Sequence, residues 1–140
     1  MSDAELVARL GSVPLFSGLD QRHLKDLANR ARVVEHPAGR EIVEEGGGSV
    51  GFHLLLEGTA KVTQGDQVRR TIGPGDYFGE ISLIDGKPRS ATVRAETPVR
   101  SLSLTAWQFA PVLEANPSMS HSILLGLCKL IREAEGRSYL

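Results

Sequence analysis

The chain carries at positions 78–93 the stretch FGEISLIDGKPRSATV, which interrupts a series of strand-like patterns. Gly79 in this stretch permits the backbone to approach another group closely. Residues 80–84 have room for little more than one helical turn before Gly86 and Pro88 end it. So short a helix leaves most of its N–H groups without internal partners, and such groups favour an anion.

The side chains around this turn suit a phosphate joined to a sugar. Arg89 offers a planar fork of donors that fits phosphate oxygens two at a time, and Ser90 adds a hydroxyl beside it. Glu80 only accepts hydrogen bonds, which suits a sugar hydroxyl or a guanidinium. A salt bridge between Glu80 and Arg89 that merely fastens a loop would use the same residues. The residues alone therefore leave both interpretations open.

On both sides of this segment the sequence predicts short strands within residues 31–104. Alternating or β-branched patterns occur at 32–35, 41–43, 52–56, 60–63, 89–93 and 99–104. Turns that contain glycine, proline or aspartate separate them. Because most of these strands are neighbours in sequence, we expect a compact antiparallel β-sandwich or barrel.

Helical patterns occupy the two ends of the chain, over residues 1–30 and 105–137. Capping signals mark the helix starts at Ser2 with Glu5, at Asp20, at Thr105 with Gln108, and at Asn116 before Pro117. Together with the strands, these patterns predict an α+β fold in a single domain spanning residues 1–140.

The last predicted helix carries two apolar stripes. One consists of Ile123, Leu127, Leu130 and Ala134, and the other of Leu124, Cys128 and Ile131. One stripe is enough to cover a domain's own core. The second indicates either a partner helix, in a homodimer or in another protein, or a helix sunk deep in its own core. The apolar neighbours of Cys128, the only cysteine, predict a packed core thiol.

Composition narrows the classes of function. With 140 residues and a formal net charge of -1, the chain lacks the surplus of Lys and Arg that nucleic acids or acidic membranes attract. The histidines are scattered without metal-ligand spacing, and the Gly-x-Ser-x-Gly match at 47–51 lacks the flanking strand and helix of a hydrolase elbow. We therefore expect no enzyme activity and no metal. Neither a signal peptide nor a membrane-spanning run is visible, which predicts a cytoplasmic protein.

The stretch 78–93 resembles the phosphate-binding cassette of the cyclic-nucleotide-binding domain family, which includes the catabolite activator protein and the regulatory subunits of cAMP-dependent protein kinase. That cassette reads Phe-Gly-Glu, a few apolar residues, then Pro-Arg-Ala/Ser/Thr-Ala-x-Val, and this sequence has each element. Residues 14–19, 56–58 and 75–76 resemble other motifs of the family, so the resemblance covers the whole chain. It implies a jelly-roll barrel of the double-stranded β-helix type, flanked by N-terminal helices and two C-terminal helices.

The resemblance also implies roles for individual residues. The phosphate would be held by Arg89, by the hydroxyl of Ser90, and by backbone N–H groups around Ser82 and Ala91. Glu80 and the backbone of Gly79 would hold the ribose 2′-hydroxyl. The positions that align with the base pocket are Val62, Arg70, Ile72, Ala134 and Glu135. Arg70 departs from the small polar residue found at this place in the activator protein.

As a member of this family, the chain would be a cyclic-nucleotide sensor that takes cAMP, although Ser90 by itself does not decide between cAMP and cGMP. Ligand binding would rearrange the C-terminal helix, residues 118–137, and so signal to a protein partner or a second copy. Because Met1 begins the chain and Leu140 ends it soon after this helix, we expect a free-standing sensor without a DNA-binding or catalytic domain, rather than an excised piece. The alternatives are a nucleotide-independent interaction module and a sensor of cGMP or a cyclic dinucleotide.

Overall fold

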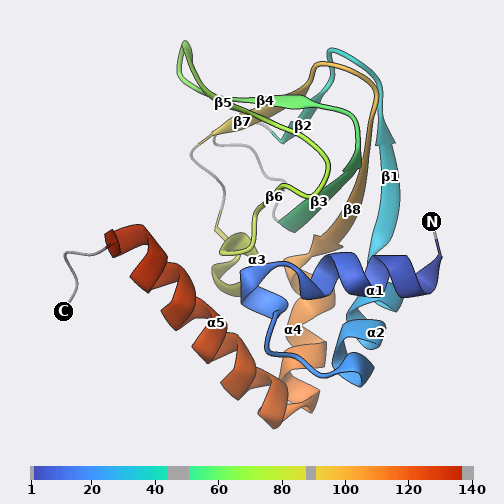
Figure 1. Ribbon diagram of the computed structural model, residues 1–140, viewed down its shortest axis with the longest axis vertical. Coiled ribbons are helices and arrows are strands. Elements are labelled where there is room, and N and C mark those ends of the chain that lie inside the picture. The colour runs from blue at the N-terminus through green and yellow to red at the C-terminus, as the bar shows by residue number, and fades with distance from the viewer. Residues whose placement is uncertain (1, 44–50, 88–90, 137–140) are drawn as a thin grey trace. The chain divides into compact units, whose positions relative to one another are not determined.

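The computed structural model describes residues 2–43, 51–87 and 91–136 (Figure 1). It contains two compact units. One consists of Met1–Arg30 and Pro111–Leu140, and we call it the helical unit. The other is Ala31–Ala110, the strand unit, which contains all of the described strands. Each unit is described separately below.

The strand unit contains two four-stranded sheets. The first has the order β1 (Arg32–His36), β8 (Val99–Thr105), β3 (Gly51–Glu57), β6 (Tyr77–Phe78). The second has the order β2 (Glu41–Val43), β7 (Thr92–Ala95), β4 (Ala60–Gln64), β5 (Gln67–Ile72). All of these pairs are antiparallel, so the predicted antiparallel architecture is confirmed. The predicted barrel is not confirmed. The two sheets remain open, because no described strand of one sheet pairs with a strand of the other.

Apolar side chains from both sheets form a core within the strand unit. Its buried members are Ile42, Val43, Leu55, Ala60, Ile72, Phe78, Val93, Ala95 and Val99. Val62 of β4 is partly buried and packs against this cluster. Full burial of a large apolar side chain contributes about 1.5–3 kcal/mol, so this cluster is a major source of the unit's stability.

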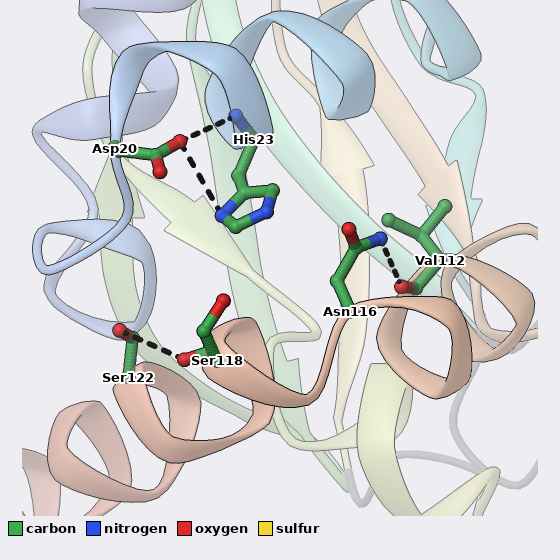
Figure 2. A network of polar contacts seen from close by, with 6 residues as sticks. All are labelled: Asp20, His23, Val112, Asn116, Ser118 and Ser122. Carbon is green, nitrogen blue, oxygen red and sulfur yellow. Dashed lines mark hydrogen bonds and ion pairs between the residues drawn. The ribbon is translucent and has the colours of Figure 1, made fainter.

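The helical unit contains α1 (Asp3–Gly11), the 3-10 turn η1 (Pro14–Phe16), α2 (Gln21–Arg30) and α5 (Pro117–Glu135). Its first two α-helices begin at the predicted caps. The Ser2 hydroxyl accepts a hydrogen bond from the Glu5 N–H at 3.2 Å, and the Asp20 carboxylate accepts one from the His23 N–H at 2.9 Å (Figure 2). Both bonds satisfy N–H groups that the first helical turn leaves free.

The remaining helix, α4 (Ala106–Ala115), continues from the strand unit into the helical unit. Its start is the predicted capping box. The Gln108 N–H donates to the Thr105 hydroxyl at 3.3 Å, and the Thr105 N–H donates to the Gln108 side-chain oxygen at 3.0 Å. The two bonds are reciprocal, as a capping box requires.

Helix α5 begins at Asn116 and Pro117 as predicted, but the Asn116 side chain does not cap it. Its amide nitrogen instead donates to the Val112 carbonyl at 2.7 Å, which ties α5 back to the end of α4 (Figure 2). Farther along α5, a Cβ added at Gly126 would lie 2.7 Å from the Leu15 carbonyl oxygen. The absence of a side chain at Gly126 therefore allows α5 to pack closely on η1.

The outer face of α5 is apolar and exposed. Leu124 is 59% exposed and Ile131 is 54% exposed, whereas Ile123 of the other stripe is buried. Cys128 is also exposed, so the prediction of a core thiol is wrong. Gly126 faces η1. Cys128 lies about 200° farther around α5 than Gly126 and therefore points away from η1. We call Leu124, Cys128 and Ile131 the outer stripe.

Among the described residues, no helix is both long enough and apolar enough to cross a bilayer.

Candidate functional site

The segment that links β6 to β7 begins at a glycine that no other residue can replace without a shift. Gly79 has φ +91°, in the region that favours glycine. A Cβ placed there would collide with the Gly51 carbonyl oxygen of β3. The predicted close backbone approach is therefore present, and the group approached is strand β3 of the protein itself.

A short helix follows, as the sequence predicts. Helix α3 spans Ser82–Asp85 and ends at Gly86, which has φ +68°. The Leu83 N–H donates to the Gly79 carbonyl at 3.2 Å, so the turn closes directly on the glycine. Within the described part of the chain, the N–H groups of Ile81 and Ser82 donate to no backbone or side-chain acceptor. These are the two groups with which such a turn can hold an anion.

The Ser82 hydroxyl, unlike the Ser82 N–H, forms a hydrogen bond within the loop. It donates to the Lys87 carbonyl at 2.9 Å, and the residue is buried. Asp85 accepts a second bond within the same loop, from the Lys87 N–H at 2.9 Å. These two bonds hold the chain as it leaves α3 and fix the direction in which it approaches position 88.

Glu80 is half-buried at the start of this turn. It forms no hydrogen bond or ion pair with any residue that the structure describes, so its carboxylate is available to accept a hydrogen bond from a ligand. The predicted ion partner or phosphate ligand, Arg89, lies outside the described residues together with Ser90. Ala91, the last predicted phosphate contact, is half-buried and directly precedes β7.

The predicted base-pocket residues of the strand unit share one face of the second sheet. Val62 of β4 lies opposite Arg70 of β5 and opposite Val93 of β7. Ile72 follows Arg70 by two residues, so its side chain points to the same face. Ile72 is only 2% exposed and belongs to the core, whereas Arg70 is exposed. The remaining two predicted residues, Ala134 and Glu135, are exposed near the end of α5 in the helical unit.

A buried polar group behind the site was not foreseen from the sequence. Ser101 of β8 lies between two histidines, with its hydroxyl 3.0 Å from His36 Nε2 and 3.4 Å from His53 Nδ1. The His53 ring stacks on Phe78, with ring centroids 5.1 Å apart, and Phe78 directly precedes Gly79. Burial, with a smaller effect from the charge of Arg40, lowers the pKa of His36.

No sequence signal marked this group, because His36, His53 and Ser101 meet only through the pairing of β1 and β3 with β8. In the sequence the histidines appear as isolated residues. The described residues contain no group of three His, Cys, Asp or Glu side chains placed to hold a metal ion.

Comparison with known proteins gives these features a common context. The family described as "Cyclic nucleotide-binding domain" matches residues 33–116. A cAMP-dependent protein kinase regulatory subunit of Emericella nidulans is 38% identical over 99 residues, which are 69% of this chain and 24% of that protein. The chain thus corresponds to about a quarter of that relative's length.

Solved structures are similar over most of the chain. The N-terminal domain of a transcriptional regulator from Streptomyces coelicolor A3(2) has a TM-score of 0.82 at 27% identity, covering 90% of this chain and 94% of that one. The regulatory domain of Toxoplasma gondii PKA, solved with cAMP, has a TM-score of 0.74 at 26% identity, covering 94% of this chain and 50% of that one.

Apart from Arg32, the first residue of β1, the matched region contains both sheets and the segment that links β6 to β7. It is more than half of the 140 residues. The chain therefore belongs to the cyclic nucleotide-binding domain family.

Proposed function

We propose that this chain captures cAMP with the segment 79–91 and passes the binding event to a partner, without catalysing a reaction on the nucleotide. The observation that carries the proposal is the turn at α3. It offers the Glu80 carboxylate and the N–H groups of Ile81 and Ser82, none of which pairs with a residue that the structure describes, within a region that matches the family. Relatives named for cAMP, a kinase regulatory subunit and a domain solved with the nucleotide, support this choice of ligand.

The proposed contacts divide the nucleotide between two kinds of group. The guanidinium of Arg89, the Ser90 hydroxyl and the N–H groups of Ser82 and Ala91 hold the cyclic phosphate. Glu80 accepts a hydrogen bond from the ribose 2′-hydroxyl. Each charge-assisted hydrogen bond contributes about 1.5–3 kcal/mol net. Three or four such bonds are sufficient for micromolar affinity, which corresponds to about 8 kcal/mol.

The proposed output is a rearrangement of α5. A ligand shifts a conformational equilibrium only when it binds one state better than the other. Ala134 and Glu135, near the end of α5, supply such a difference if they contact the base in one arrangement of α5 and not in the other. The exposed outer stripe of Leu124, Cys128 and Ile131 is the surface proposed to contact the protein partner, either another protein or a second copy.

The phosphate contacts are tested by isothermal titration of the wild type, Arg89→Ala and Lys87→Ala with cAMP, cGMP and cyclic di-AMP. We expect cAMP to bind the wild type and Arg89→Ala to weaken it about a hundredfold, since two charge-assisted bonds are lost. Lys87→Ala is the matched control. It removes a neighbouring exposed cation but leaves intact the backbone bonds of Lys87 to Ser82 and Asp85.

Two results would overturn this assignment. Unchanged cAMP affinity in Arg89→Ala would remove the phosphate site from residue 89. A wild type that takes up none of the three nucleotides would favour the interaction module, whose supporting observation is the exposed outer stripe.

The ribose contact is tested separately with 2′-deoxy-cAMP. The wild type should prefer cAMP to the deoxy compound, and Glu80→Ala should bind both compounds equally, because the acceptor for the 2′-hydroxyl is gone. A preference for cAMP that survives in Glu80→Ala would assign the ribose contact to another group.

A further inference from the structure

A cavity of about 520 Å³ lies in the strand unit, where β1 and β3 end and β8 begins. This volume is typical of small-molecule sites, which span about 300–1,000 Å³. Glu57, which lines the cavity, ends β3, whereas Gly51, against which the turn at Gly79 packs, begins it. A strand of this length extends roughly 20 Å, so the cavity is separate from the candidate functional site.

Arg100 is the centre of a row of three charged side chains that line this cavity. Glu35 of β1 and Glu57 of β3 lie opposite Arg100 of β8. The Nη1 atom of Arg100 donates to Glu57 at 3.2 Å, whereas the nearest Glu35 oxygen lies 3.9 Å from Nε, beyond hydrogen-bond reach. Glu35 is also 83% exposed. Arg100 therefore engages Glu57 and leaves the Glu35 carboxylate available to a second cation.

Arg40 brings the opposite charge to the same cavity. Its backbone is fixed, because its carbonyl accepts from the Ala95 N–H at 2.9 Å and its N–H donates to the Pro37 carbonyl at 3.1 Å. Its guanidinium forms no hydrogen bond or ion pair within the described part of the chain. The fork of donors on Arg40 is therefore open to a carboxylate, which an arginine binds with two parallel hydrogen bonds.

His36 lies beside Arg40 in the lining and adds one further donor. Its Nε2 atom is held by the Ser101 hydroxyl at 3.0 Å. Its Nδ1 atom bonds to no residue that the structure describes, which leaves this nitrogen for a ligand.

We propose that this cavity binds a free amino acid with an apolar side chain, with its carboxylate on Arg40 and its ammonium on Glu35. An amino acid carries one charge of each sign near neutral pH, as Arg40 and Glu35 do together. A purely anionic ligand would meet Arg40 but would be repelled by Glu35. The lining residues Pro37, Pro98 and Val99 provide apolar surface for the side chain of the ligand.

The test compares ligands that differ in one charged group at a time. L-Phenylalanine and L-leucine carry both groups, 3-phenylpropionate lacks the ammonium, and 2-phenylethylamine lacks the carboxylate. Each is titrated into the ¹⁵N-labelled chain, and the backbone amide signals of residues 35–40 and 99–100 report both the place and the affinity. We expect at least one of the two amino acids to bind there, about tenfold more tightly than either single-charge compound.

Two variants assign the charges to their residues. Arg40→Ala should weaken the amino acid and 3-phenylpropionate about tenfold and leave 2-phenylethylamine unchanged. Glu35→Gln should weaken the amino acid and 2-phenylethylamine and leave 3-phenylpropionate unchanged. Arg69→Ala and Asp66→Asn, which remove exposed charges of the same signs from the hairpin of β4 and β5, are the matched controls and should change none of the affinities.

Three results would overturn the proposal. Amide signals of residues 35–40 and 99–100 that respond to neither amino acid would remove the ligand from this cavity. Equal binding of phenylalanine and 3-phenylpropionate would exclude a role for Glu35. Losses in the control variants as large as those in Arg40→Ala and Glu35→Gln would assign the effect to the general charge of the strand unit. Binding of cAMP is measured independently, so either proposal can fail while the other stands.

Discussion

At the scale of single residues, His36 is a titratable group held in an environment that disfavours its charged form. It is buried at the end of β1, and its Nε2 atom lies 3.0 Å from the Ser101 hydroxyl. Burial is the main reason that its pKa is lowered, and the positive charge of Arg40 adds to the effect. The native state therefore binds this proton less readily than the unfolded chain does.

The lowered pKa of His36 predicts that the free energy of unfolding decreases as the pH falls below about 6.5, the ordinary pKa of histidine. Above that pH the imidazole is neutral in both the native and the unfolded state, so it does not make the free energy of unfolding depend on pH. Below it the unfolded state takes up the proton first, which favours unfolding until the pH reaches the lowered pKa. Urea denaturation between pH 7.5 and pH 5 measures this slope. In His36→Gln, which cannot titrate, the slope should be smaller.

A His36→Gln variant that keeps the full wild-type slope would assign the pH dependence to other groups. Native spectra at pH 7.5 for both proteins are the control, since Gln can still bond to Ser101 through its side-chain amide.

For single residues, the sequence predicted the structure only where the deciding interaction lies within a few neighbouring positions. The special role of Gly79 could be predicted, because glycine before a one-turn helix indicates an unusual backbone. Cys128 could not be placed, because its burial depended on which face of α5 turns toward η1, and that face is set by Gly126 against Leu15. The Asn116 side chain likewise donates to the Val112 carbonyl instead of capping its own helix, and the sequence does not show which of these two hydrogen bonds forms.

At the scale of elements, helix α3 is bounded by two glycines with positive φ but unlike surroundings. A Cβ at Gly79 would collide with the Gly51 carbonyl, whereas a Cβ at Gly86 would meet nothing within 4 Å. Both substitutions introduce a left-handed alanine, and only one introduces a steric clash. The pair therefore separates backbone strain from the packing of α3 against β3.

We expect Gly86→Ala to lower the free energy of unfolding by about 1 kcal/mol, the usual cost of a left-handed non-glycine residue. Gly79→Ala should lower it by about 3 kcal/mol or more, because the backbone of β3 or of the turn must also move. Urea denaturation of the two variants beside the wild type measures the difference. Equal losses in both would show that Gly79 does not position α3 against β3.

Element-level prediction was most successful where one short segment contains its own signal. The caps at Ser2, Asp20 and Thr105 each join residues three apart, so the sequence shows both partners of the bond. The sheets were harder, because β1 pairs with β8 and β2 with β7 across most of the strand unit. Strand patterns indicate the existence of such strands but do not say whether the sheets close. That is why the sandwich was predicted correctly and the barrel was not.

At the scale of the whole molecule, the proposed site residues belong to two units. Gly79, Glu80 and Ser82 lie in the strand unit, while Ala134 and Glu135 lie in the helical unit. The sequence could associate these groups only through a family resemblance, since no local pattern joins position 80 to position 135. The same separation makes the two halves of the proposed function independently measurable.

If the nucleotide only fills the turn at α3, its effect on amide exchange stays within the strand unit. If it also engages the end of α5, exchange slows in both units, because coupling of about 1–3 kcal/mol corresponds to roughly fivefold or more in an opening equilibrium. We expect saturating cAMP to slow exchange in α3 and, by about fivefold or more, in the C-terminal half of α5. Arg89→Ala at the same nucleotide concentration is the control and should show neither change. Protection of α3 with unaltered exchange in α5 would leave the binding proposal standing and remove the proposed route to a partner, because a helix that does not respond to the ligand cannot report its presence.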